Sequence, residues 1–150
     1  MPNWCNNTLR LEHTDPAMIQ KFVAGFKKGE AMQEFLPCPQ ELRDSPAPFR
    51  GDNADALVEK YGASDWYNWC VNNWGTKWDA AHGYINLESS KELELGFDTA
   101  WSPPIPFYKK LEEMGFSVSA EYKEDGLEFI GEYADGVDEC YEYDFSNEDW

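Results

Sequence analysis

Residues 4–29 read WCNNTLRLEHTDPAMIQKFVAGFKKG, and the spacing of apolar side chains changes within this segment from two residues to three or four. Over residues 4–12 the apolar side chains lie two positions apart, which is typical of a strand with one buried face. Asp15-Pro16 then has the residue types that begin a helix, and Gly29 has the type that ends one. The segment therefore predicts a strand followed by a helix.

Helical spacing recurs at three places downstream. Gly62 ends the first of these segments and Ser64 is the expected N-cap of the second, while a proline pair begins the third. Residues 30–53 contain several prolines and predict a loop that wraps the domain or covers it as a lid. The three expected helices lie at about 54–61, at 65 to about 74, and after Ser102-Pro103-Pro104.

From residue 82 the period of two returns. Apolar side chains alternate with polar ones on both sides of Ser89-Ser90, which predicts a hairpin. Asp-Gly pairs, the residue types that favour tight turns, separate the later segments. We expect strands at about 116–123, 127–134 and 137–143, with turns at Asp125-Gly126 and Asp135-Gly136.

This order of elements is strand, helix, insert, two strands, helix, and then further strands. It predicts an α+β fold, specifically a ferredoxin-like antiparallel sheet with helices on one face. A helical and loop insert occupies about 30–78, after the first helix, and extra strands lie in an acidic C-terminal segment of about 116–150. The length of 150 residues predicts one domain spanning 1–150.

The composition is strongly acidic and rich in aromatic residues. Aromatic side chains make up 16% of the chain, enough to favour a packed core over disorder. The formal net charge is -17, and residues 76–150 contain 19 acidic but only 5 basic side chains. A field of this sign repels phosphate backbones and anionic lipids. We therefore expect neither direct nucleic-acid binding nor a membrane association.

The four cysteines show no metal-binding spacing. They stand at positions 5, 38, 70 and 140 without a CxxC pair, and the chain has only two histidines. The N-terminal residues lack the basic start and apolar run of a secretory signal. These observations predict free thiols in a cytoplasmic protein.

Four short stretches resemble a known family. They are residues 1–7 (MPNWCNN), 73–79 (NWGTKWD), 99–104 (TAWSPP) and 126–133, which contains Phe129 and Gly131. Together they are similar to the YubB-like, or Api-type, ferredoxin-like family encoded by phages and plasmids. The resemblance implies a ferredoxin-like domain from a mobile element, acting in the cytoplasm of a bacterial host. It implies no activity and no catalytic or binding residues.

The first candidate site is the cluster of tryptophans with its neighbouring polar side chains. Indole faces and a few fixed polar groups are what a planar ligand needs, and a base stacked on an aromatic side chain gains about 1–3 kcal/mol. The other interpretation is that the indoles fill the core beneath the insert. The candidate residues are Trp66, Trp69, Trp74, Lys77, Trp78, Trp101, Asn6 and Asn73.

The second candidate site is the acidic surface of the C-terminal strands. Carboxylates along neighbouring strands resemble a line of phosphates and fit a basic groove, and tyrosines are favoured interface anchors. A solubilising surface is the alternative interpretation. The candidate interface residues are Glu121, Glu128, Glu132, Asp138, Glu139, Tyr141, Glu142 and Tyr143.

Catalysis has little support in the sequence. None of the nucleotide-binding, metalloprotease or nucleophile-elbow motifs is present. Cys5 or Cys70 with His13 or His82 is a conceivable nucleophile–base pair, but nothing in the sequence brings these residues together. We expect no catalytic residues, no metal and no cofactor.

Two functions compete on this basis, both of them non-enzymatic and both directed against a host system such as a defence pathway. In the first, the acidic strands bind a host protein that has a basic surface and so imitate a nucleic acid. In the second, the tryptophan motifs and the insert sequester a small nucleotide-like ligand. A plain structural or assembly module is a third interpretation.

Overall fold

The computed structural model describes residues 3–44, 47, 51 and 53–144. Met1 and Pro2 of the first motif and Pro46 and Pro48 of the expected loop lie outside these residues. The strands are β1 (Trp4–Glu12), β2 (Ala81–Glu88), β3 (Glu92–Ala100), β4 (Ser117–Glu124), β5 (Phe129–Ala134) and β6 (Val137–Glu142). The helices are α1 (Pro16–Lys27), α2 (Ala31–Phe35), α3 (Gln40–Arg43), α4 (Ala54–Tyr61), α5 (Trp66–Asn73) and α6 (Ile105–Glu113).

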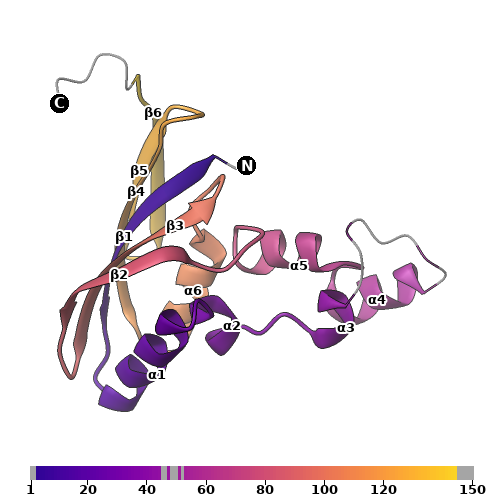
Figure 1. The fold of residues 1–150 in the computed structure, drawn as a ribbon, viewed down its shortest axis with the longest axis horizontal. Coiled ribbons are helices and arrows are strands. Elements are labelled where there is room, and N and C mark those ends of the chain that lie inside the picture. The colour runs from indigo at the N-terminus through magenta and orange to yellow at the C-terminus, as the bar shows by residue number, and fades with distance from the viewer. Residues whose placement is uncertain (1–2, 45–46, 48–50, 52, 145–150) are drawn as a thin grey trace.

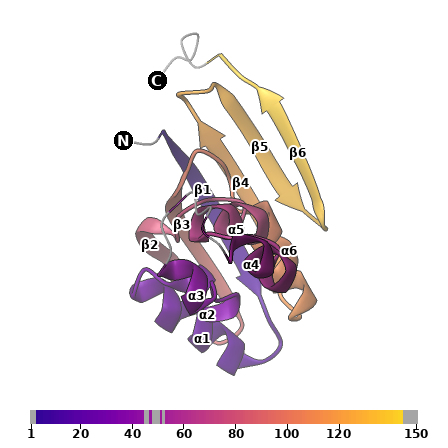
Figure 2. The same ribbon diagram turned by 90° about the vertical axis from the view of Figure 1, so that its right-hand side faces the viewer.

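The six strands form one antiparallel sheet in the order β2-β3-β1-β4-β5-β6. Its first four strands, with α1 and α6 in the two crossovers, have the order of a ferredoxin-like sheet. The helices lie on one side of the sheet, and β5 and β6 extend it beyond them (Figures 1 and 2). The predicted α+β fold with extra C-terminal strands is confirmed.

The core lies between the sheet and the helices. Leu9 of β1 faces Leu95 of β3 on one side and Ala120 of β4 on the other, and all three side chains are buried. On α1, Ile19 and Phe22 point into the same core. Full burial of a large apolar side chain contributes roughly 1.5–3 kcal/mol, so this layer supplies most of the driving force for the fold.

Local rules account for most of the helix ends. Asp15 accepts a hydrogen bond from the amide of Ala17 at the start of α1, and Gly29 has a left-handed φ of 73° just past its end. The N-cap of α5 is Asp65 rather than the expected Ser64, because the Asp65 carboxylate accepts a bond from the Asn68 amide at 2.8 Å.

The segment expected to be a loop contains two short helices, α2 and α3. In neither helix does the side chain of the N-cap residue accept a hydrogen bond from the first turn, and both helices are too short to show a helical hydrophobic period. For this reason the sequence pattern does not reveal them. α2 lies beside α1, whereas α3, α4 and α5 form an arm that projects from the helical side of the sheet (Figure 1). We refer to residues 30–78 as the insert.

The two C-terminal turns differ in kind. Asp135 and Gly136 have φ angles of 53° and 79°, as a two-residue hairpin turn requires. The β4–β5 connection is longer than the expected Asp125-Gly126 turn. It spans residues 125–128, because the buried Glu124 carboxylate accepts hydrogen bonds from the amides of the two residues after Asp125, at 2.6 and 3.0 Å.

Two glycines of the sheet lie beneath a tyrosine of a neighbouring strand. A Cβ atom on Gly96 would meet the ring of Tyr84, and one on Gly131 would meet the ring of Tyr122. Tyr84 is 57% exposed, so its ring has room to move aside, whereas Tyr122 is buried and donates a hydrogen bond to Asp138. A Cβ on Gly131 would also lie 2.6 Å from a backbone oxygen of β6.

Replacing Gly131 with alanine should therefore lower the free energy of unfolding by about 1–3 kcal/mol, because the added methyl overpacks a fixed site. Gly96→Ala is the matched control and should cost less than half as much. Urea unfolding of both variants measures the difference. Equal losses in the two variants would contradict this account of the two tyrosines.

Candidate functional site

No helix of the described residues covers the face of the sheet opposite the helices, and we call this face the open face (Figure 1). Strand register places Thr8, Glu121, Glu132 and Glu139 side by side across it, one from each of β1, β4, β5 and β6. We call the three glutamates the acidic row. The sequence predicted all three residues, and the register brings them together.

A shallow cavity of about 510 Å³ lies over this part of the open face. Glu121, Glu132 and the cation Lys123 line it, and Ile130 and Tyr141 add apolar surface from β5 and β6. The Tyr141 hydroxyl donates a hydrogen bond to Glu139 at 2.8 Å, and this bond raises the pKa of the tyrosine. The surface thus combines carboxylates, one lysine and an aromatic side chain, and the excess of carboxylates suits a partially apolar, cationic partner.

The acidic row is electrostatically unfavourable in isolation. Like charges directly opposite each other on neighbouring strands are destabilising. Among the described residues, the recorded ion pairs of the sheet join Arg10 to Glu94 at 3.7 Å and His82 to Asp98 at 2.8 Å. Neither of these ion pairs includes a glutamate of the acidic row, and Lys123 of β4 lies on the same face as the row.

The remaining predicted interface residues lie elsewhere. Asp138 and Glu142 point to the helical side of the sheet, where Asp138 accepts a 2.5 Å hydrogen bond from Tyr122. Burial and this bond raise the pKa of Tyr122. Glu128 lies in the β4–β5 connection, and its carbonyl accepts a bond from the amide of Tyr143. The sheet therefore divides the predicted surface between two faces.

An oriented histidine lies at the β2 side of the open face. Asp98 accepts hydrogen bonds on both carboxylate oxygens, from His82 at 2.8 Å and from the predicted Asn6 at 2.6 Å. The ring of Trp4 packs against the imidazole with centroids 4.9 Å apart. His82 has a φ of 53° at an irregularity in β2. Sequence reasoning missed Asp98, whose partners are distant in the chain.

The predicted tryptophans separate into three groups. Trp69 and Trp74 are core residues with ring centroids 5.8 Å apart, and Trp74 donates its indole N–H to the Leu36 carbonyl at 2.8 Å. Trp66 and Trp78 are more exposed and line a cavity. Trp101 is 43% exposed and lies outside that cavity.

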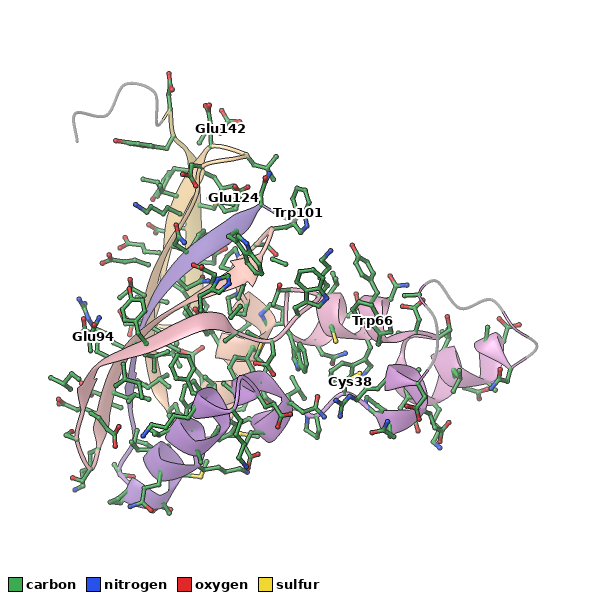
Figure 3. The ribbon with its side chains drawn as sticks, in the orientation of Figure 1. Cys38, Trp66, Glu94, Trp101, Glu124 and Glu142 are labelled. Carbon is green, nitrogen blue, oxygen red and sulfur yellow. The ribbon has the colours of Figure 1, made fainter. Side chains whose placement is uncertain are left out.

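The cavity has a volume of about 370 Å³ and lies where the insert meets the sheet, and we call it the tryptophan pocket. Predicted Lys77 lines it, with its ammonium 4.3 Å from the ring centroid of Trp78. Predicted Asn73 instead bonds the Trp69 carbonyl within α5. Figure 3 shows Cys38 and Trp66 near each other in the insert. The lining residues are Gly29, Glu30, Gln33, Cys38, Arg43, Trp66, Cys70, Trp74, Lys77, Trp78 and Asp79.

Arg43 was not predicted from the sequence, and it changes the charge of the tryptophan pocket. It interacts electrostatically with the thiols of Cys38 and Cys70, which form a hydrogen bond with each other. Burial raises the pKa of both thiols, so they stay protonated at neutral pH and do not neutralise the guanidinium. The pocket therefore holds two cationic side chains, Arg43 and Lys77, together with the carboxylates of Glu30 and Asp79.

Asp79 links the insert to the sheet. Its half-buried carboxylate accepts hydrogen bonds from the amides of Met32 and Gln33, at the start of α2, and from the amide of Ala80. Burial raises the pKa of Asp79, while these three bonds oppose the rise. Asp79 thus serves as a distant N-cap for α2 and fixes one wall of the tryptophan pocket.

The conceivable nucleophile–base pairs do not form. His13 bonds the Met114 carbonyl and His82 bonds Asp98, whereas Cys5 contacts Asn7. In the part of the chain that the structure describes, no group of three or more histidine, cysteine or acidic side chains is arranged to hold a metal. Within the same residues, no helix has the length and apolar character needed to cross a membrane.

Replacing Asp79 with alanine should lower the free energy of unfolding by about 1–3 kcal/mol, since buried amides of α2 lose their acceptor. Hydrogen exchange at the Met32 and Gln33 amides should quicken as well. The exposed Asp44 carboxylate accepts a hydrogen bond from the Gln40 side chain, and Asp44→Ala is the control variant with little expected effect. Unchanged exchange at the α2 amides in Asp79→Ala would contradict the capping role.

Comparison with known proteins supports the fold. No protein-family model and no curated protein sequence matches the chain. A crystal structure of the protein Api92 from Yersinia pseudotuberculosis, described with the family model DUF1281, has a similar fold with a TM-score of 0.51. The similarity covers 95% of this chain and 98% of that one, at 11% sequence identity. At that identity the likeness establishes a shared architecture across nearly the whole chain.

Proposed function

We propose that this chain is a non-enzymatic binding protein whose open face holds a positively charged host protein, in place of the nucleic acid that such a protein would bind. The observation that carries the proposal is the acidic row on the uncovered side of the sheet. Neighbouring strands are about 4.8 Å apart, against about 3.4 Å of helix axis per phosphate along one DNA strand, so both are linear arrays of closely spaced negative charge. The row is thus a short linear array of negative charge.

A basic protein is the partner that the open face suits best. The charge of -17 repels nucleic acids and anionic membranes, whereas it steers a cationic surface toward the carboxylates. Tyr141, next to Glu139 on β6, is 54% exposed, and Tyr84, in register with Thr8 on the β2 side of the open face, is 57% exposed. Such rings supply the apolar contact area that anchors an interface, so binding would not depend on charge alone.

The biological setting of the proposal is a phage or plasmid that counteracts a host defence system in the bacterial cytoplasm. This setting, like membership of the YubB-like family, rests on the four sequence motifs that resemble that family. The similar fold of Api92 supports the ferredoxin-like part of the resemblance. We propose no reaction and no cofactor, because the residues that define the open face have the chemistry of recognition rather than of catalysis.

If the acidic row is retained at a cost in stability, removing its central charge should stabilise the protein. Glu132→Gln should raise the free energy of unfolding by roughly 0.2–1 kcal/mol at low salt, and less at high salt, where the charges are screened. Urea unfolding at two salt concentrations measures this. Glu113, which pairs with Lys110 on α6, gives the control Glu113→Gln, which should not stabilise. A loss of stability in Glu132→Gln would contradict the repulsion.

Binding itself is tested with the triple variant Glu121→Gln, Glu132→Gln and Glu139→Gln. Its affinity for a short Lys- and Arg-rich peptide and its recovery of basic proteins from a bacterial lysate should both fall at least about tenfold at low salt. Bound host protein should be released by added duplex DNA if the open face occupies a nucleic-acid site. Calorimetry and quantitative pull-down provide the measurements.

The matched control is the triple variant Asp55→Asn, Glu59→Gln and Glu113→Gln, which removes the same charge from the helices. It should bind as the unmodified chain does. Equal weakening in the two triple variants would mean that only net charge matters. In that case the acidic face would be a solubilising surface and the proposal would fail.

A further inference from the structure

The proposed docking on the open face leaves the tryptophan pocket without a role. Its volume of about 370 Å³ falls within the range of small-molecule sites, which begins near 300 Å³. Two of its walls are indoles: Trp66 opens α5 and Trp78 follows α5 in the chain. Trp78 keeps 41% of its surface exposed, so an aromatic face is accessible from solvent. These features suit a planar ring.

Two cationic side chains of the pocket are available to an anionic group of a ligand. Among the described residues, neither Arg43 nor Lys77 has a carboxylate partner in a recorded ion pair. The oxygens of Asp79, which also lines the pocket, already accept three backbone N–H groups. The two neighbouring thiols are neutral because burial raises their pKa. A guanidinium and an ammonium therefore face the cavity, and together they suit an anionic group.

The negative charge of the whole chain does not cancel this local field. The acidic row belongs to β4, β5 and β6, whereas the pocket belongs to the insert and its junction with the sheet. Figure 3 shows Cys38 and Trp66 in a different part of the molecule from Glu124 and Glu142. Salt screens charges over about 8 Å at physiological ionic strength, so the acidic row contributes little to the potential in the pocket.

We propose that the tryptophan pocket binds a planar aromatic ligand that carries a phosphate group, of the size of a nucleoside monophosphate. The ring stacks on the indole of Trp66 or Trp78, and the phosphate accepts hydrogen bonds from Arg43 and Lys77. The ammonium of Lys77 already lies over Trp78, and its flexible side chain lets it turn toward a phosphate without moving the backbone. Glu30, another lining residue, is an acceptor for ring N–H groups.

The test is a calorimetric titration of the full chain with the 5′-monophosphates of adenosine, guanosine, cytidine and uridine, one at a time. Inorganic phosphate and the free nucleosides are titrated in parallel. We expect saturable binding of at least one monophosphate. Phosphate alone and nucleoside alone should bind at least about tenfold more weakly, because each makes only part of the contacts.

Variants identify the site. Arg43→Gln and Lys77→Gln should each weaken binding about tenfold, as expected for the loss of one charge-assisted hydrogen bond. Lys109→Gln removes an exposed cation from α6 and should leave the affinity unchanged. Trp78→Leu should weaken binding more than Trp101→Phe, because Trp101 does not line the pocket. The unfolding transition of each variant without ligand shows whether it is folded.

The site can also be located by NMR on the unmodified chain, a measurement that does not require any variant to fold. The indole N–H resonances of Trp66 and Trp78 should shift on addition of the bound monophosphate, and that of Trp101 should not. The proposal is overturned if no monophosphate binds, if phosphate alone binds as tightly as the best nucleotide, or if only resonances outside the pocket respond.

The two proposals are separable by the same variants. The triple variant of the acidic row should bind a monophosphate as the unmodified chain does, since its substitutions lie on the open face. Conversely, Arg43→Gln should bind the basic peptide normally. Loss of nucleotide binding in the acidic-row variant would overturn the separation of the two sites.

Discussion

The pairing of β1 with a strand on each of its edges is the constraint on which the rest of the structure depends. β1 is hydrogen-bonded to β3 and to β4, so its alternation assigns the faces of both neighbours. Leu9 and Leu11 lie toward the helices, which leaves Thr8 and its row on the open face. A slip of one residue would exchange the two faces. β5 pairs with β4, and β6 pairs with β5, so the register of β1 also decides that the acidic row lies on the open face.

The elements that follow local rules could be predicted from the sequence. The alternation in β1, the Asp15 cap of α1 and the Asp135-Gly136 turn all depend on neighbouring residues, and all three are present. The sequence did not predict which C-terminal carboxylates lie on the open face and which on the helical side. β6 extends beyond the helices, and every residue in it is exposed, so hydrophobicity does not mark an inner face there. Register alone separates Glu139 from Asp138.

The features missed in the candidate sites depend on partners distant in the sequence. α2 is five residues long and receives its cap from Asp79, which lies 47 residues beyond Met32. Arg43 reaches the tryptophan pocket from α3, a helix of four residues without a hydrophobic period of its own. The sequence motifs did identify the indoles and Lys77 of the pocket. They could not show which indoles pack in the core, because burial is decided by the position of the insert.

The tryptophan pocket holds two cations beside the carboxylates of Glu30 and Asp79, whereas the acidic row consists of carboxylates, and this contrast gives each site its own class of ligand. A cationic protein surface is attracted by the acidic row and repelled by the Arg43 and Lys77 side chains. A phosphate is repelled by the carboxylates and attracted by those two cations. The sites lie on different elements, and screening confines each field to its surroundings. A single fold with a large net negative charge can therefore hold an anion-binding pocket beside a surface for a basic partner, provided that the insert keeps the pocket away from β4, β5 and β6.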